Sequence, residues 1–360
     1  MAKSLEICPK RLIGSDNPCF IIAEVGQNHQ GDMEIAKHLI LKAKESGADC
    51  VKFQKSDLAT KFNAASLARP YLSENSWGET YGTHKSHLEF SESQFRQLQQ
   101  YSQEIGIPFT ASAMDEVSLQ FLHSLNVPFI KIGSGDANNY QLLRSAAATG
   151  RPIVLSTGMQ SMEGVRKAVQ CVLEAQAGGD ARLCVLQCTS SYPTPPSHVN
   201  LRVMRTYAQE FPGVHIGYSG HEEGYAISLA AAALGAKVIE RHITFDKNAK
   251  GSDHKCSLEP EEFCRLVSGV REIEAALGTG VKEILAAEEP VIKKLGKTLV
   301  STQDLAPGTI IQREHLVAKV AEPRGINAEL VDCVVGQELL RFIKKDESLL
   351  STDFKTSFHD

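Results

Sequence analysis

Residues 152–174, PIVLSTGMQSMEGVRKAVQCVLE, carry the pattern that decides the fold of this chain. An apolar run at residues 152–156 is followed by a Ser-Thr-Gly turn and then by residues 161–174, whose apolar positions have helical spacing. A near-continuous apolar run is typical of a strand that is buried on both faces of a parallel sheet. The stretch therefore predicts one strand followed by a helix that covers it.

The same unit recurs from about Cys19 to Ala276. Helical patterns include residues 33–46, 116–125, 161–174 and 225–234. Expected strands lie at residues 20–25, 49–54, 108–113, 129–133, 152–156, 183–188, 215–219 and 237–243. Eight strand–helix units in roughly 260 residues predict a closed (β/α)8 TIM barrel. The alternative is an open, doubly wound sheet, which usually has fewer strands and a GxGxxG first turn that is missing here.

Residues 56–92 separate the second expected strand from its helix and are too long for a simple connection. They contain Trp77, two tyrosines and two histidines, with few helical signals. Long loops on barrels are often functional lids. The alternative is a surface excursion that packs on its own aromatic side chains.

After Gly278 the rhythm stops, which predicts three parts: a barrel at residues 1–278, a linker at 279–295 and a small β-rich domain at 296–354. Residues 281–294 have the pattern of a charged helix. Two turn-containing stretches of the last part, residues 305–310 and 343–349, resemble each other. A domain of roughly 60 residues buries little core, so we expect it to dock on another surface.

Composition excludes several classes of protein. The chain has 360 residues and a net charge of −5, which argues against nucleic acid or an anionic membrane as partner. No stretch approaches the roughly 20 apolar residues of a membrane span. The start, residues 1–11, lacks the apolar core of a signal peptide. Nine scattered cysteines without a CxxC pair predict free thiols in the cytoplasm.

Polar residues gather at the ends of the expected strands, where barrels form their active sites. Lys52 and Lys131 interrupt apolar strands, and a buried ammonium is costly unless a carboxylate or an anionic ligand meets it. Ser134, Ser156 and Ser219 each lie beside glycine, as in many turns, but together they could let hydroxyl and N–H groups approach a phosphate. Phosphoenolpyruvate, with a carboxylate and a phosphate of about −1.5 to −2, fits such a set.

His221 and His242 end neighbouring strands. A lone histidine there is usually only hydrogen-bonded, but two on adjacent strands can reach one ion. Two imidazoles with oxygen ligands suit Mn²⁺, Fe²⁺, Co²⁺ or Zn²⁺. Glu24 or Glu240 could orient a metal-bound water or move a proton, which makes both candidate catalytic residues.

Five motifs, in order, resemble those of the sialic acid synthase family. They are AEVGQNHQG at residues 23–31, KIGSG at 131–135, STGM at 156–159, GYSGH at 217–221 and IERH at 239–242. The resemblance extends from about Cys19 to Phe354, and the last part resembles the antifreeze-like (SAF) domain that these enzymes carry. It implies a transferase that condenses phosphoenolpyruvate with an N-acetylated mannose, with loss of phosphate by C–O cleavage.

The resemblance also implies roles for matching positions. His221 and His242 would bind a divalent cation, Mn²⁺ or Mg²⁺, with Co²⁺ as an option, and Glu24 would be a catalytic carboxylate. Phosphoenolpyruvate would meet Lys52, Thr110, Lys131, Ser134, Ser156, Ser219 and Ser190, the last of which replaces an asparagine common in bacterial members. The sugar would meet Gln54, Tyr192, Asp253 and Arg324. In the family that arginine reaches the partner subunit of a homodimer with swapped C-terminal domains.

The GQNHQG motif at residues 26–31 and the long segment 56–92 favour the animal type of the family. That type uses N-acetylmannosamine 6-phosphate and makes N-acetylneuraminate 9-phosphate. Candidates for the second phosphate on this segment are Lys61, Arg69, His84 and Lys85. Two other functions remain as alternatives: a pyruvate-lyase aldolase that forms a Schiff base at Lys131, and a binding protein whose antifreeze-like domain is the active part. The two buried lysines argue against the second.

Overall fold

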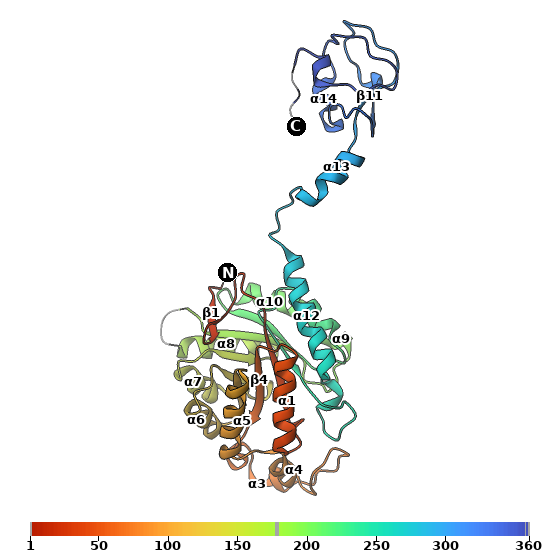
Figure 1. Cartoon of the computed structure of the whole chain (residues 1–360). Coiled ribbons are helices and arrows are strands. Elements are labelled where there is room, and N and C mark those ends of the chain that lie inside the picture. Colours follow the sequence, from red (N-terminus) through yellow and green to blue (C-terminus); the bar gives the residue numbers. More distant parts are fainter. Residues whose placement is uncertain (1, 177–179, 357, 359–360) are drawn as a thin grey trace. The chain divides into compact units, whose positions relative to one another are not determined.

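The computed structural model describes residues 2–176, 180–356 and 358, and it divides into two compact units, Met1–Gly278 and Thr279–Asp360. The first unit is built around a closed barrel of eight parallel strands, with helices around the outside (Figure 1). Around the barrel the strands follow the order β10-β3-β4-β5-β6-β7-β8-β9. The predicted (β/α)8 barrel is therefore confirmed, and the open sheet is excluded.

All eight expected strands form, with ends that differ from expectation by a few residues at most. They are β3 (Phe20–Gly26), β4 (Cys50–Lys55), β5 (Phe109–Ala113), β6 (Ile130–Ile132), β7 (Ile153–Ser156), β8 (Leu183–Cys188), β9 (His215–Gly220) and β10 (Val238–His242). Nearly every strand residue is buried, because helices cover the outer face while side chains fill the inside.

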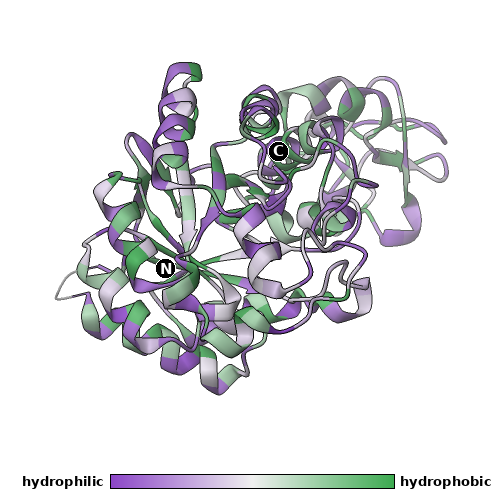
Figure 2. Ribbon diagram, turned by 90° about the horizontal axis from the view of Figure 1, so that it is seen from below, coloured by the Kyte–Doolittle hydropathy of each residue, from purple (hydrophilic) through white to green (hydrophobic). Residues whose placement is uncertain are grey.

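The helices outside the barrel have the expected amphipathic patterns. In α8 (Met162–Ala175), the Ser161 side chain accepts a hydrogen bond from the Gly164 N–H and so caps the helix, while Val165, Val169 and Val172 face the core. The other helices around the barrel are α1 (Met33–Glu45), α5 (Glu92–Ile105), α6 (Glu116–Ser124), α7 (Tyr140–Ala148), α10 (Arg202–Glu210), α11 (Ala226–Ala233) and α12 (Pro260–Leu277), besides the short α9 (Pro196–Val199). In Figure 2 the helical ribbons carry both hydrophobic and hydrophilic positions.

The inside of the barrel has two chemically different halves. At the amino end of the strands, alternate residues form a dry cluster that a hairpin of β1 (Leu5–Cys8) and β2 (Arg11–Ile13) closes. The cluster contains Ile7, Cys8, Ile13, Phe20, Ile22, Cys50, Phe129, Val154, Cys184, Leu186 and Val238. Toward the carboxyl end the same alternation brings Glu24, Lys52 and Glu240 inward, since Glu24 pairs with Lys52 across β3 and β4.

The excursion between β4 and α5 is more helical than its sequence suggested. It contains α2 (Leu58–Lys61), α3 (Ala64–Ala68) and α4 (Tyr81–Leu88). Each begins at a side-chain cap, Asp57, Asn63 or Thr80, rather than at a long apolar pattern. Aromatic rings also pack within the excursion, as expected for one of the two alternatives; the ring centroids of Tyr71 and Tyr81 lie 5.3 Å apart. In Figure 1, α3 and α4 lie at the end of the barrel opposite to β1.

The second unit has its own core but few regular elements. It contains η3 (Ala286–Glu288), α13 (Glu289–Leu295), β11 (Thr298–Ser301), η4 (Arg313–His315), β12 (Leu316–Lys319), η5 (Ala328–Leu330), α14 (Val331–Val334) and η6 (Ser351–Asp353). The expected linker helix is thus shorter than residues 281–294. The two similar stretches pair with each other, because Leu305 and Ile343 exchange backbone hydrogen bonds of 2.8 and 2.9 Å.

Among the described residues, no helix combines the length and the apolar character needed to cross a bilayer. The cysteines are free thiols, and seven of the nine are buried.

Candidate active site

A cavity of about 470 Å³ opens at the carboxyl ends of the barrel strands. Each of the eight strands contributes at least one lining side chain, from Glu24 on β3 to His242 on β10. Its volume lies in the range of small-molecule sites, roughly 300–1,000 Å³. The convergence of the strands explains why residues far apart in sequence meet here.

Two buried lysines and two buried glutamates form the floor of the cavity. The Lys52 Nζ lies 2.5 Å from the Glu24 Oε2 and 3.7 Å from the Glu240 Oε1. The Lys131 Nζ lies 3.6 Å from the same Glu240 oxygen. All four side chains are almost fully buried. Each buried lysine therefore has a carboxylate nearby, as its burial requires. Because the four groups line an open cavity, an anionic ligand can also reach the lysines.

The two carboxyl groups differ in their affinity for protons. Burial raises the pKa of Glu24 to about 7, even though Lys52 and Gln54 favour its ionised form. Burial acts on Glu240 in the same direction, but the ammonium groups of Lys131 and Lys52 outweigh it and hold the pKa of Glu240 below its usual range. Glu24 is thus suited to exchange a proton near neutral pH, while Glu240 stays ionised.

The two lysines also differ. Burial disfavours both ammonium groups, but Glu24 and Glu240 outweigh it at Lys52 and raise its pKa. At Lys131 burial prevails over Glu240, and the pKa of Lys131 is lowered. An anion bound beside Lys131 would stabilise its charged form, which Glu240 alone stabilises only in part.

Serine hydroxyls line the side of the cavity formed by β6, β7 and β8. The Ser134 Oγ accepts a 2.9 Å hydrogen bond from the Gly158 N–H. A side chain at Gly158 would collide with Ser134 and Ser190, so this close approach requires glycine. The buried hydroxyls of Ser156 and Ser190 have no hydrogen-bond partner within the described protein. Such groups indicate a polar ligand, because unsatisfied buried hydroxyls are costly.

His221 and His242 lie next to each other in the cavity lining, with ring centroids 5.4 Å apart. Burial lowers the pKa of His242 to about 3, so its imidazole is neutral, as metal ligation requires. The buried His242 Nδ1 has no hydrogen bond within the described protein and lies 3.8 Å from the Asp253 Oδ2. No group of three or more His, Cys, Asp or Glu side chains in the described residues is arranged to hold a metal. The donors fit a cation that takes its remaining ligands from oxygen atoms of substrate or water.

Behind the histidines a buried ion pair fixes the ends of β9 and β10. The Arg241 Nη1 donates to the Glu222 Oε1 at 2.7 Å, and the Tyr218 hydroxyl donates to the Glu222 Oε2 at 2.6 Å. Glu222 follows His221 and Arg241 precedes His242, so the pair holds both histidines in place. Neither Glu222 nor Tyr218 was predicted as part of the site, because the buried pair forms only when Arg241 of β10 is brought beside the end of β9.

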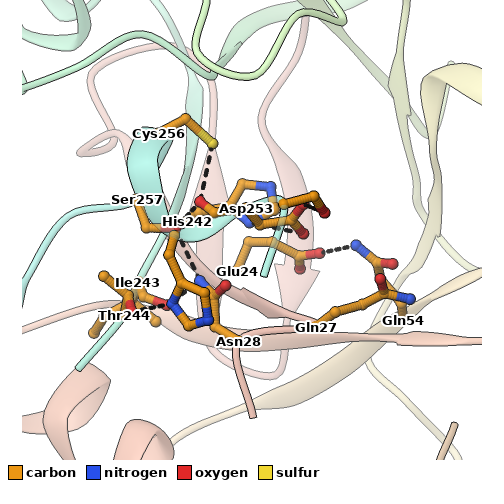
Figure 3. Close-up of polar contacts among 12 residues, drawn as sticks. Glu24, Gln27, Asn28, Gln54, His242, Ile243, Thr244, Asp253, Cys256 and Ser257 are labelled. Atoms are coloured by element: carbon orange, nitrogen blue, oxygen red, sulfur yellow. Dashed lines mark hydrogen bonds and ion pairs between the residues drawn. The ribbon is translucent and has the colours of Figure 1, made fainter. Parts of the chain in front are cut away.

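The residues predicted for catalysis, metal, phosphoenolpyruvate or the sugar line the cavity, apart from Thr110, Asp253 and Arg324. Thr110 lies one step below it, beside Lys52, and its hydroxyl donates to the Phe129 carbonyl at 2.8 Å; Ser112 faces the cavity instead. Asp253 lies next to His242 outside the lining (Figure 3). Arg324 belongs to the second unit, where it donates to the Asn327 Oδ1 at 2.9 Å.

Sequence reasoning also gave no role to Asn28 and Cys188. The Asn28 amide donates to the Ile243 carbonyl and to the Ser257 hydroxyl, both at 2.8 Å, and so joins β3 to the segment after β10 (Figure 3). Cys188 lines the cavity between Ser134 and His221. The position of Asn28 in the GQNHQG motif was a usable signal, whereas nothing marked Cys188 among the scattered cysteines.

The family model described as the NeuB family matches residues 39–282 of the chain, which is more than half of it. The chain belongs to the NeuB family. Curated relatives align with the chain over nearly its whole length. N-acetylneuraminate-9-phosphate synthase of Homo sapiens is 53% identical over 97% of this chain and 96% of its own. N,N'-diacetyllegionaminic acid synthase of Legionella pneumophila is 37% identical over 94% and 95%.

A solved structure of a NeuB-like enzyme has the same fold. The N-acetylneuraminic acid (sialic acid) synthetase of Leptospira borgpetersenii, in complex with citrate, superposes with a TM-score of 0.69 at 33% identity, over 81% of this chain and 96% of that one. The sequence-based assignment to sialic acid synthases is confirmed.

Proposed function

We propose that the chain is a transferase of sialic acid biosynthesis that condenses phosphoenolpyruvate with N-acetylmannosamine 6-phosphate. The products are N-acetylneuraminate 9-phosphate and inorganic phosphate. The human relative that carries this activity in its name is 53% identical, against 37% for the legionaminic acid synthase. The observation that carries the proposal is the cavity itself. The two buried lysines of its floor and the unsatisfied serine hydroxyls of its side suit a small ligand with both a carboxylate and a phosphate.

Phosphoenolpyruvate would lie over β4 to β9. Lys131 and Lys52 would pair with its anionic groups, while Ser134, Ser156 and Ser190 donate to oxygen atoms of its phosphate or carboxylate. Ser219, whose hydroxyl donates to the Glu240 Oε1 at 3.4 Å, lies close enough to contribute. Thr110 would act by holding β5 in place beneath Lys52, because its hydroxyl is already used.

The sugar would lie between Gln54, Tyr192 and Asp253, with its aldehyde toward the histidines. Tyr192 packs on His221 with a centroid distance of 4.2 Å, so it can shape this side of the cavity. A divalent cation, Mn²⁺ or Mg²⁺, held by His221 and His242 would supply Lewis acidity toward the aldehyde oxygen.

The reaction then uses the two glutamates differently. C3 of phosphoenolpyruvate attacks the aldehyde carbon, and water adds to the cationic C2 that results. Loss of phosphate by C–O cleavage gives the 2-keto acid. Glu24, with a pKa of about 7, can take the proton of that water or deliver one to the new alkoxide. Glu240 keeps Lys131 and Lys52 charged and aligned.

We further propose that the second unit is an antifreeze-like (SAF) domain at residues 296–354, reached through the linker at 279–295. In a homodimer with exchanged C-terminal domains, an exposed Arg324 of one subunit would contact the N-acetyl group in the other. The nine free cysteines fit the reducing cytoplasm. Mixing inactive Lys131→Met with inactive Arg324→Met would restore part of the activity if subunits share sites; no recovery would exclude sharing.

Phosphate release tests the function directly. We expect release with phosphoenolpyruvate and N-acetylmannosamine 6-phosphate, loss of release after chelation, and recovery with Mn²⁺ or Mg²⁺. Oxygen-18 in the bridging position should leave with phosphate; label in the sugar acid would reject C–O cleavage.

The lowered pKa of Lys131 is also compatible with an alternative function, an aldolase that forms a Schiff base with pyruvate. Treatment with pyruvate and borohydride would trap such an adduct at Lys131. We expect none, because the nearby Glu240 and the anionic substrate favour the charged ammonium.

A further inference from the structure

A second, smaller cavity adjoins the active site on the side of the long excursion. Its volume is about 90 Å³, and it shares the lining residues Gln54, Lys61 and Met114 with the larger cavity. Gln54 marks the junction, since its amide donates to the Glu24 Oε1 at 2.9 Å (Figure 3). A ligand in the active site can therefore extend a group of a few heavy atoms into this space.

Two lysines of the excursion face this small cavity without an ion-pair partner among the described residues. The Lys85 Nζ, from the last turn of α4, donates to the Gln27 Oε1 at 3.1 Å. The Lys61 Nζ, at the end of α2, has the Met114 Sδ at 2.8 Å, and thioether sulfur is a weak acceptor. Burial lowers the pKa of both lysines, and nearby carboxylates oppose this shift only in part.

The other titratable residues of this cavity do not neutralise the lysines. Glu89 is already used, because its Oε1 accepts from the Lys55 Nζ at 2.6 Å and its Oε2 from the Ser56 hydroxyl at 2.8 Å. His29 stacks on Phe90 and is neutral, since burial lowers its pKa to about 3. More distant carboxylates, Asp136, Asp115 and Asp253, act on the lysines only through space. The small cavity therefore holds two lysine side chains, and neither has a direct ion-pair partner among the described residues.

We infer that this small cavity is a phosphate subsite, in which Lys61 and Lys85 bind the terminal phosphate of a phosphorylated sugar substrate. A phosphate ester of about −1.5 to −2 matches two ammonium groups. The inference rests on the proposed function, and it assigns the preference for a phosphorylated sugar to these two residues.

Arg69 and His84, the other candidates on the excursion, line neither cavity. The Arg69 guanidinium lies over the ring of Tyr81, 4.2 Å from its centroid, and is otherwise exposed. His84 accepts a hydrogen bond from the Trp77 N–H at 3.2 Å, and burial lowers its pKa to about 4, so it is neutral.

The test compares kcat/KM for N-acetylmannosamine 6-phosphate with kcat/KM for N-acetylmannosamine at saturating phosphoenolpyruvate. Lys61→Met and Lys85→Met should each lower this ratio about 10- to 100-fold, the cost of losing a hydrogen bond between charged groups. Because both values come from one preparation, the ratio does not depend on how much of a variant folds. Lys85→Arg should retain most of the preference.

Arg69→Met is the matched control, since it removes one positive charge from the same excursion without touching the cavity; its ratio should equal that of the unmodified chain. Three results would overturn the subsite: equal use of both sugars by the unmodified chain, equal loss with both sugars in the lysine variants, or a raised KM for phosphoenolpyruvate in place of a changed ratio. No turnover of either sugar by the unmodified chain would instead reject the proposed function.

Discussion

The two halves of the barrel interior are built from the same strands but hold opposite kinds of side chain. Near the amino ends, Phe20 and Phe129 pack edge to face at 5.9 Å within a dry cluster. Two or four residues farther along the same strands, Glu24 and Lys131 lie in a charged cavity. Only the position along the strand differs, since the pleat points all of these side chains inward.

The two halves therefore contribute differently to the free energy of folding. In the dry half, each Å² of apolar surface removed from water stabilises the fold by about 25 cal/mol. No charged group among the described residues loses its hydration there to offset this gain. A buried ion pair often contributes no more than apolar residues of similar volume would. We therefore expect substitutions in the dry half to act on unfolding, and those in the charged half to act on turnover.

The largest expected effect is Phe129→Ala in the dry half. Removing this fully buried ring should lower the free energy of unfolding by about 3–5 kcal/mol. Urea unfolding measures the loss, and kcat at a temperature where the variant is folded should stay near that of the unmodified chain. Leu72→Ala, at a side chain 96% exposed, is the control and should change stability by less than about 0.5 kcal/mol. A loss of kcat without loss of stability in Phe129→Ala would break the comparison.

Lys131→Met is the corresponding change in the charged half. Turnover should fall about 10²- to 10³-fold, equivalent to about 2.7–4 kcal/mol of transition-state stabilisation, because a charged donor to the substrate anion is lost. Its unfolding free energy should fall less than that of Phe129→Ala, since Glu24 can take up a proton and relieve the charge imbalance.

Lys167→Met removes an exposed lysine of α8 that forms a surface ion pair with Glu163, and it controls for the loss of one positive charge. We expect normal turnover from it. Lys131→Met with more than a tenth of normal turnover would mean that the anion does not depend on this lysine.

A smaller effect is expected behind the histidines, where a hydrogen-bonded network takes the place of apolar packing. Tyr218→Phe removes one hydrogen bond to the buried Glu222 carboxylate and should cost about 1.5–3 kcal/mol of stability. Turnover should also fall, because His221 precedes Glu222 and would be held less firmly. The Mn²⁺ concentration needed for half-maximal activity should rise. Unchanged stability would show that Arg241 and Ser228 hold Glu222 without the tyrosine.

The sequence predicted the strands well because burial on both faces leaves a local mark, a continuous apolar run. It also predicted which strand-end residues meet, since parallel strands bring their carboxyl ends together. The hairpin of β1 and β2 was missed because strands of four and three residues carry no usable period. Thr110 was taken from the family resemblance although Ser112, two residues farther along β5, faces the cavity. Both side chains point inward, and the sequence does not record how far along the strand the cavity begins. The different pKa values of Glu24 and Glu240 depend on which lysine lies beside each, which no local pattern records.

The smallest expected effect is a pH dependence of stability in the dry half. His215 begins β9 at this end of the barrel and is almost fully buried, with its ring against the hairpin end at Gly14. Burial lowers its pKa below the usual value of about 6.5, with Lys237 acting in the same direction. Above that value the ring is neutral in folded and unfolded chains, so it adds no pH dependence.

As the pH falls below about 6.5, the unfolded chain binds a proton that the folded ring resists, and stability is lost until the pH passes the lowered pKa. His29 contributes a loss of the same sign, since its pKa is about 3 in the fold. The contribution of His215 is therefore measured by comparing the pH dependence of the unmodified chain with that of a His215 variant. Urea unfolding at pH 7.5 and pH 5 should show a shallower decline for His215→Gln than for the unmodified chain. Equal declines would mean that the hairpin lets water reach the ring, and that the dry half is less tightly closed than its packing indicates.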